Sequence, residues 1–177
     1  MLHIMQDIET WSTRNNALLI SIGAVKFDKD NIIDRFEVGI DPVDAARYGL
    51  HIDPETVQWW MHPDRREALD RWQALPKVDL AAALDGFSQW VRFDTDELGS
   101  LWGNGATFDN VKLKSAFDAV GLEYPVSFRQ DECYRTMKNR FPTVEFVRVG
   151  VSHSPLDDAM SQALHLQEIA RQFGVTL

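Results

Sequence analysis

Two carboxylates stand two positions apart near the start of the chain. Asp7 and Glu9 lie in the sequence QDIET, directly after a short, mostly apolar segment that is typical of a strand. Side chains two positions apart on a strand face the same side, so these two carboxylates converge on one point. Like charges held together need a proton or a cation, and Mg²⁺ and Mn²⁺ prefer such oxygen ligands. Taken alone, the common D-x-E pattern is more typical of a solvated strand end than of a metal site.

A third carboxylate follows a glycine-containing turn in the sequence GNGATFD. Gly103 and Gly105 permit a tight turn, and Asp109 falls in the first turn of an expected helix. Taken alone, an acidic residue at this place indicates only a favourable interaction with the helix dipole.

A histidine and two aspartates form the last group, in the sequence HSPLDD. The proline and the acidic pair predict the start of a helix. We expect Asp157 to serve only the helix terminus, and Asp158 to turn inward beside Met160 and Leu164. A carboxylate in such apolar surroundings needs a metal or a hydrogen-bond donor. A lone histidine such as His153 is more often structural than catalytic.

Together and in this order, the three groups resemble the motifs of the DnaQ-like DEDDh exonucleases. The resemblance covers nearly the whole chain, and it is strongest to the short branch that includes T-even phage exonuclease A and the mycobacterial exoribonuclease. The matching text is QDIETWST, ISIGAVKFD, WW at 59–60, WGNGATFDN and HSPLDDAMSQA. Gln6 departs from the apolar residue usual before the first aspartate. The sister DEDDy group has a tyrosine where this chain has Ser154, so His153 indicates the DEDDh subclass.

The resemblance implies a 3′-5′ exonuclease that hydrolyses phosphodiester bonds at nucleic-acid 3′ ends and releases nucleoside 5′-monophosphates. Its cofactors would be two divalent ions, Mg²⁺ or Mn²⁺, one generating the attacking hydroxide and one stabilising the leaving oxygen. In the family pattern Asp7 bridges both ions, Glu9 and Asp158 hold the ion on the nucleophile side, and Asp109 reaches the other ion largely through water. His153 would be the general base, because an imidazole with an unperturbed pKa of about 6.5 accepts a proton at neutral pH.

Residues beside the first two motifs are the expected substrate contacts. They are Thr10, Trp11, Ser12, Asn104 and Phe108. Many relatives have histidine at the position of Asn104. The indole of Trp11 could stack on a terminal base, for about 1–3 kcal/mol, or could instead belong to the core.

A tryptophan pair and several cations are further candidates. We expect Trp60 to pack inward with Val57 and Met61, and Trp59 to contact a base or a partner subunit. The candidate phosphate contacts are Lys112, Lys114, Arg129, Arg135, Lys138, Arg140 and Arg148.

The net charge of −9 argues against a long basic groove for nucleic acid. Residues 1–98 hold 10 basic and 18 acidic side chains, whereas residues 99–177 hold 8 and 9. A surface for a polyanion should therefore lie mainly in the C-terminal half, with the metal ions offsetting the four site carboxylates.

The elements that must position these residues follow from hydrophobic periodicity. Strands are predicted at 2–7, 18–27 and 32–40, as a three-strand antiparallel meander, with a further strand at 100–104. Helices are predicted from residue 53 and at 64–75, 79–93, 107–120, 131–140 and 155–173. This order predicts an α/β fold, a mixed sheet with helices on both faces, which the resemblance makes RNase H-like. At 177 residues, one domain spanning 1–177 is expected.

Location and competing functions can also be considered from the sequence. No apolar run approaches the roughly 18–20 residues of a membrane helix, and the lone Cys133 fits a reducing compartment, so we expect a cytoplasmic protein without a membrane partner. A homodimer is suggested by the resemblance alone. An RNase H-type endonuclease would use similar carboxylates without needing the histidine. A non-catalytic nucleic-acid-binding or polymerase-associated module would not need all five site residues. No residue indicates a preference for RNA or for DNA.

Overall fold

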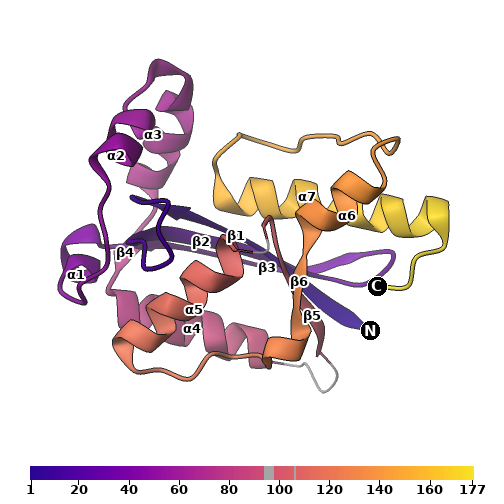
Figure 1. Cartoon of the computed structure of the whole chain (residues 1–177), viewed down its shortest axis with the longest axis horizontal. Coiled ribbons are helices and arrows are strands. Elements are labelled where there is room, and N and C mark those ends of the chain that lie inside the picture. Colours follow the sequence, from indigo (N-terminus) through magenta and orange to yellow (C-terminus); the bar gives the residue numbers. More distant parts are fainter. Residues whose placement is uncertain (94–97, 106) are drawn as a thin grey trace.

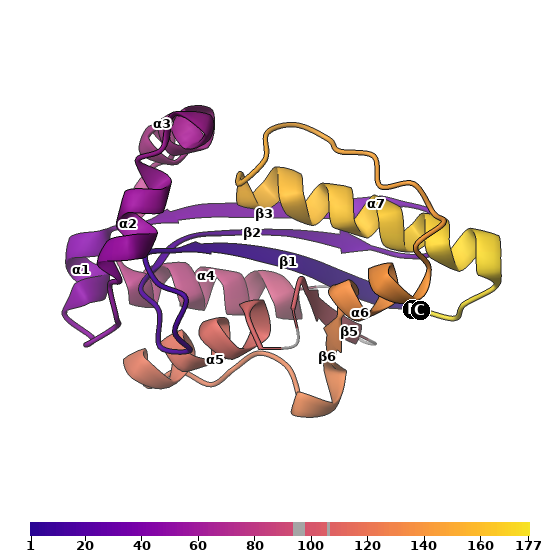
Figure 2. The ribbon, with the colours of Figure 1, turned by 45° about the horizontal axis from the view of Figure 1, so that its top comes forward.

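The computed structural model describes residues 1–93, 98–105 and 107–177, and it shows a central sheet between two layers of helices (Figures 1 and 2). The strand order is β4-β3-β2-β1-β5-β6. Helices α4 and α5 lie against one face, and α7 runs across the other (Figure 2). The predicted mixed α/β sheet with helices on both faces is confirmed.

The predicted antiparallel meander forms the middle of the sheet. Its strands are β1 (Leu2–Thr10), β2 (Leu19–Phe27) and β3 (Ile32–Ile40). Strand β5 (Leu98–Gly103) pairs in parallel with β1, so the carboxyl ends of both strands meet at one edge. Two short strands form the edges of the sheet: β4 (Lys77–Val78), parallel to β3, and β6 (Asp131–Cys133), parallel to β5. Neither was expected, because two or three residues carry no periodic signal.

The helices agree with the sequence patterns except around residue 131 and at Pro42–Ala46, a five-residue helix that was not predicted. They are α1 (Pro42–Ala46), α2 (Pro54–Trp60), α3 (Arg66–Ala74), α4 (Leu80–Arg92), α5 (Asp109–Val120), α6 (Tyr134–Arg140) and α7 (Pro155–Phe173). Short 3₁₀ turns lie at Pro63–Arg65 and Phe128–Gln130. The helix predicted at 131–140 begins at Tyr134, because the three residues before it form β6. In the described part of the chain, no helix has the length and apolarity needed to cross a membrane.

Alternation along β1 divides its side chains between two cores. Ile4 and Ile8 pack with α4 and α5, whereas Met5 packs with α7. Asp7 and Glu9 follow Met5 at odd positions and therefore lie on the face that α7 covers. The inward face of α7 differs from the prediction at Leu164. Leu164 is 39% exposed, since the helix instead turns Leu166 toward the sheet.

Candidate active site

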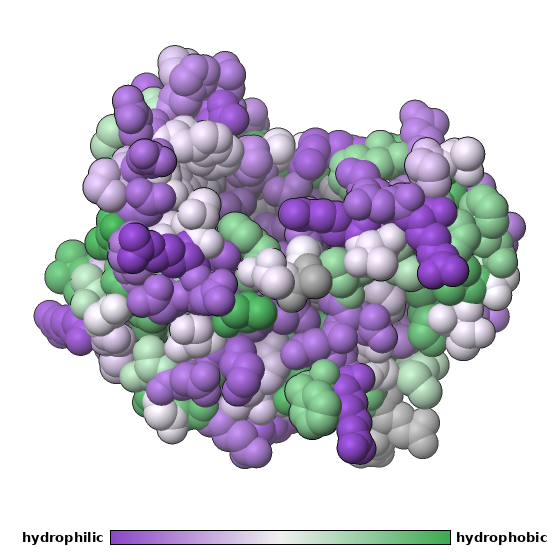
Figure 3. Space-filling view, viewed as in Figure 1, coloured by the Kyte–Doolittle hydropathy of each residue, from purple (hydrophilic) through white to green (hydrophobic). Residues whose placement is uncertain are grey.

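A cavity of about 550 Å³ opens where β1 and β5 end and where α5 and α7 begin. The surface dips between the side formed by α2 and α3 and the side formed by α6 and α7, and hydrophilic residues surround the dip (Figure 3). The cavity is lined by all five expected catalytic residues, Asp7, Glu9, Asp109, His153 and Asp158. These side chains come from three segments that are far apart in the sequence, around residues 7–9, 109 and 153–158.

Each carboxylate reaches the cavity from the end of an element. Asp7 and Glu9 come from β1, Asp109 from the first residue of α5, and Asp158 from the first turn of α7. The amide of Gln162, one turn further along α7, donates from Nε2 to Oδ1 of Asp7 at 2.9 Å. This bond joins α7 to β1 inside the site.

Burial and mutual repulsion make the negative charges at this site costly. Burial raises the pKa of Asp7 well above its usual range, and the neighbouring Asp109 and Asp158 raise it further. The pKa of Glu9 is raised in the same way, by burial first and then by Asp7. Burial also raises the pKa of Asp109, to about 6, against opposing interactions with backbone groups. A bound cation would remove this cost.

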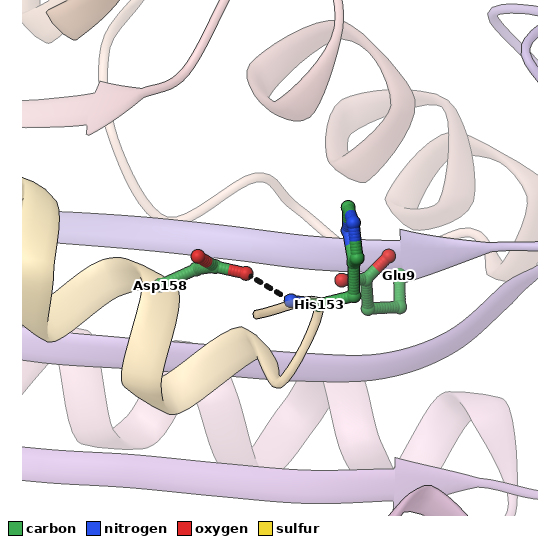
Figure 4. A group of neighbouring side chains, drawn as sticks. All are labelled: Glu9, His153 and Asp158. Carbon is green, nitrogen blue, oxygen red and sulfur yellow. Dashed lines mark hydrogen bonds between the residues drawn. The ribbon is translucent and has the colours of Figure 1, made fainter. Parts of the chain in front are cut away.

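The arrangement of donor atoms fits a hard divalent cation. One ligand atom each from Glu9, His153 and Asp158 lies within 4.8 Å of the other two (Figure 4). The buried Oδ2 atom of Asp109 has no hydrogen-bond partner among the described residues. Carboxylate oxygens that are buried, crowded and incompletely paired are suitable ligands for Mg²⁺ or Mn²⁺.

The backbone of His153 adopts an unusual conformation that Asp158 supports. Its φ of 65° is the one positive value at a non-glycine residue in the described ranges. Its backbone N–H donates to Oδ2 of Asp158 at 2.7 Å (Figure 4). Burial lowers the pKa of the imidazole, against the opposing effect of Asp158. The ring is therefore neutral, and able to accept a proton, at neutral pH.

The tryptophan pair contributes a contact that we did not expect. Trp60 is buried as predicted, and its Nε1 donates to the carbonyl of Thr10 at 3.1 Å, but Met61 is 71% exposed and does not pack inward with it. Trp59 lines the cavity and meets the His153 ring edge-on, with centroids 4.9 Å apart and planes at 86°. Trp59 therefore restrains the imidazole. The sequence around Trp59 did not predict its contact with His153.

The structure brings four of the five expected substrate contacts to the cavity, namely Thr10, Ser12, Asn104 and Phe108. Trp11 does not appear among the described residues that line it. The Trp11 indole instead packs edge-on against Trp60 and Trp72, with centroids 6.2 and 5.6 Å away. Strand β1 ends at Thr10, so the alternation of its side chains does not extend to Trp11.

Two of the seven candidate phosphate contacts line the cavity in the described part of the chain, Arg135 and Arg148. Nη2 of Arg135 donates to the carbonyl of Asn104 at 2.6 Å, and Nη1 of Arg148 lies 2.5 Å from Oδ1 of Asp158. Lys112 is 1% exposed and lies under the Phe108 ring, 3.6 Å from its centroid, so it cannot reach a phosphate in solvent.

Asp157 does more than the helix-terminus role that we expected. Its Oδ2 accepts from the backbone N–H of Val151 at 2.7 Å and pairs with Arg71 of α3. The Asp157 carboxylate thus connects α7 with the segment before it and with α3. Arg71 is 86 residues away in the chain, so no local pattern could indicate this partner.

Sequence reasoning also missed a polar strip on the α2 side of the cavity, formed by Asp53, Glu55 and Thr56. The sequence assigned Asp53 to the N-terminus of α2, and its side chain does accept from the backbone N–H of Glu55 at 3.2 Å. The same turn lines the cavity that holds the four site carboxylates, a placement that depends on the tertiary fold.

Solved structures share this fold at low sequence identity. The nuclease domain of 3′hExo, described as a DEDDh family member bound to rAMP, has 14% identity and a TM-score of 0.66, with 97% of this chain and 92% of that chain covered. ExoI of E. coli, from the metal-free form of its ssDNA complex, has 13% identity and a TM-score of 0.69, with coverages of 98% and 40%. A 3′-exonuclease described as recognising the 3′ end of histone mRNA stem-loop has 14% identity and a TM-score of 0.64, with coverages of 97% and 82%. The predicted RNase H-like fold is confirmed.

Sequence comparison then assigns the family. No curated protein sequence matches the chain. The family model described as the 3′-5′ exoribonuclease Rv2179c-like domain matches residues 2–170. The chain therefore belongs to the family of 3′-5′ exoribonuclease Rv2179c-like domains, and it is a 3′-5′ exonuclease.

Proposed function

We propose that this exonuclease removes nucleotides one at a time from the 3′ end of single-stranded RNA, or of an RNA 3′ overhang, and releases nucleoside 5′-monophosphates. The observation that carries the proposal is the convergence of four carboxylates and one histidine on a single cavity. The choice of RNA rests on the description of the family as exoribonucleases.

In this proposal, two divalent ions, Mg²⁺ or Mn²⁺, supply the activation of water and the stabilisation of the leaving oxygen. Asp7 would hold both ions, Glu9 and Asp158 the ion on the nucleophile side, and Asp109 the other. His153 takes the proton of the attacking water on a ring nitrogen, since its imidazole is kept neutral by burial. The hydrogen bond from Gln162 orients the Asp7 carboxylate toward the cavity.

The cavity also supports the binding of a single-stranded end. Phe108 and Trp59 both line the cavity with aromatic rings, one at the start of α5 and one in the last turn of α2. Bases stack on such rings without regard to sequence. Thr10, Ser12 and Asn104 are the proposed polar contacts to the terminal nucleotide, and the Arg135 and Arg148 guanidinium groups lie on the α6–α7 side of the same cavity.

Assembly and location remain proposals of the same kind. We retain a homodimer, which the sequence resemblance suggested, and a cytoplasmic location, for which the single cysteine is suitable. Size-exclusion chromatography with light scattering measures the first, and fractionation of cells measures the second.

The function is tested with matched 5′-labelled RNA and DNA oligonucleotides, single-stranded, blunt and with 3′ overhangs, incubated with Mg²⁺, Mn²⁺ or EDTA. We expect RNA to shorten from its 3′ end by single nucleotides, faster than DNA, and the reaction to stop in EDTA. Faster shortening of DNA would contradict the choice of RNA. Internal cuts would instead indicate an endonuclease.

A further inference from the structure

The Asp158 carboxylate has a cationic partner within the protein itself. Nη1 of Arg148 lies 2.5 Å from Oδ1 of Asp158, while Oδ2 accepts from the backbone N–H of His153. Both carboxylate oxygens of this proposed metal ligand are therefore engaged by groups of the protein. A divalent ion that binds Asp158 must compete with the guanidinium for the same oxygen, because two cations cannot approach one another closely without repulsion.

The backbone that carries Arg148 is held firmly against α7. The Ser161 hydroxyl accepts from the backbone N–H of Val149 at 2.9 Å and donates its own proton to the carbonyl of Asp157 at 2.7 Å. Two residues after Val149, the backbone N–H of Val151 donates to Oδ2 of Asp157. Gly150 fits closely between these anchors, since a Cβ there would lie 2.2 Å from the Asp157 carboxylate. The backbone is thus fixed, and a change of partner at Arg148 requires only rotation of its own side chain.

The Arg148 side chain is placed so that it can serve two partners. It is 38% exposed and lines the cavity, whereas the Asp158 side chain is 11% exposed. A guanidinium released from a carboxylate matches a phosphate, which accepts two parallel N–H bonds from the same planar group. A substrate phosphodiester must come close to the site carboxylates for the reaction to occur, so its phosphates come within reach of this side chain.

We infer that Arg148 pairs with Asp158 until a divalent ion takes that carboxylate, and that its guanidinium then binds a phosphate of the substrate. This inference rests on the proposed function, since it assumes that Asp158 is a metal ligand. Metal binding and substrate binding are then coupled, because each favours the conformation in which the Arg148 guanidinium no longer pairs with Asp158. The residue acts as a substrate contact only when the metal is present.

The first test is calorimetric titration of Mn²⁺ into the RNA-free wild type and the Arg148→Gln protein. We expect Arg148→Gln to bind Mn²⁺ at least about fivefold more tightly, since the competing cation is gone. Arg135→Gln is the matched control, because Arg135 lines the same cavity but bonds to a backbone carbonyl. Its Mn²⁺ affinity should stay within about twofold of that of the wild type. Unchanged or weaker Mn²⁺ binding by Arg148→Gln would overturn the competition.

The second test measures RNA binding with and without the metal. Both proteins carry His153→Asn, so that the oligonucleotide stays intact while the carboxylates remain. In Mg²⁺, adding Arg148→Gln should weaken binding of a short single-stranded RNA by about tenfold or more. In EDTA it should change binding by less than about twofold. Equal effects in Mg²⁺ and EDTA, or no effect in either, would overturn the inference.

The two proposals fail in different ways. A wild-type protein that binds no Mn²⁺ and degrades no RNA would contradict the proposed function and this inference together. A wild type that binds Mn²⁺ and degrades RNA, beside an Arg148→Gln protein with unchanged Mn²⁺ affinity, would contradict this inference alone.

Discussion

Gly23 of β2 lies directly beneath the first turn of α7, so closely that a Cβ at Gly23 would be 2.1 Å from the backbone nitrogen of Leu156. Gly23 is also the β-sheet partner of Asp7. The absence of a side chain at this one position therefore lets α7 bring Asp158 down to the carboxylates of β1. A glycine in the middle of a buried strand is explained by this close approach.

Gly23→Ala should push the start of α7 away from the sheet, because the clash is with backbone atoms that cannot rotate aside. We expect a loss of stability of about 1–3 kcal/mol, a loss of activity of at least about tenfold, and weaker Mn²⁺ binding. Thermal unfolding, RNA degradation and calorimetry measure the three effects.

Gly86→Ala is the matched control for this substitution. Gly86 lies within α4, and a Cβ there would meet nothing within 4 Å. This protein should be fully active and up to about 1 kcal/mol more stable, as alanine favours a helix. Wild-type activity and Mn²⁺ affinity in Gly23→Ala would show that the close approach does not position the site.

Replacing His153 should remove the general base but leave the metal ligands in place. Asn is the better substitute, because asparagine tolerates the positive φ of this residue more readily than alanine does. We expect His153→Asn to lower the rate by about 10²–10⁴-fold while Mn²⁺ affinity changes only a few-fold. Complete loss of Mn²⁺ binding would mean that the imidazole is a ligand, as its distance from Glu9 and Asp158 would also allow.

The metal-free protein should lose stability as the pH rises through about 6, through the contribution of Asp109. Burial raises the pKa of this carboxyl in the folded state above its value in the unfolded chain. Its favourable contribution is therefore complete at low pH, below the unfolded pKa, and is lost as the pH rises through the folded pKa. In EDTA, the melting temperature of Asp109→Asn relative to that of the wild type should increase between pH 5 and pH 7. A constant difference across this range would contradict the raised pKa.

The fold was largely predictable because its main elements are long and periodic. The three strands of the meander and α7, which begins at Pro155 and ends before Gly174, agree with the sequence patterns to within a few residues. Strand β6 was predicted as part of a helix, since its three residues pair with β5 only through the tertiary fold. Leu164 was placed on the wrong face because several faces of α7 carry apolar residues.

The sequence predicted which carboxylates form the site, but not the hydrogen bonds and ion pairs that hold them. The motifs indicated the residues that the cavity brings together, whereas the bonds from Gln162 to Asp7 and from Arg148 to Asp158 join side chains that share no sequence motif. Trp11 packs against the core and not into the cavity, because it follows the end of β1, where strand alternation no longer predicts the direction of a side chain. Such effects depend on packing, which local patterns do not record.

Nucleic acid should be held by few phosphate contacts, since Arg135 and Arg148 are the cations that line the cavity among the residues the structure describes. The logarithm of affinity for single strands falls with the logarithm of salt concentration by about 0.7 per neutralised phosphate. We therefore expect a slope no steeper than about −3 for RNA binding to His153→Asn in Mg²⁺. A slope near −6, or affinity that rises with strand length beyond about ten nucleotides, would reveal an extended basic track.

The most direct test of the account compares the wild type with Asp7→Ala in a time course on 5′-labelled RNA in Mg²⁺. Asp109 and Asp158 both act on the pKa of Asp7, and Gln162 donates a hydrogen bond to its carboxylate. Asp7 is also the proposed ligand of both ions, so no other residue of the site can replace it. The account predicts stepwise shortening from the 3′ end by the wild type, and a rate at least about 10³-fold lower for a folded Asp7→Ala protein. Degradation by Asp7→Ala at a rate near that of the wild type would contradict metal-dependent catalysis at this site.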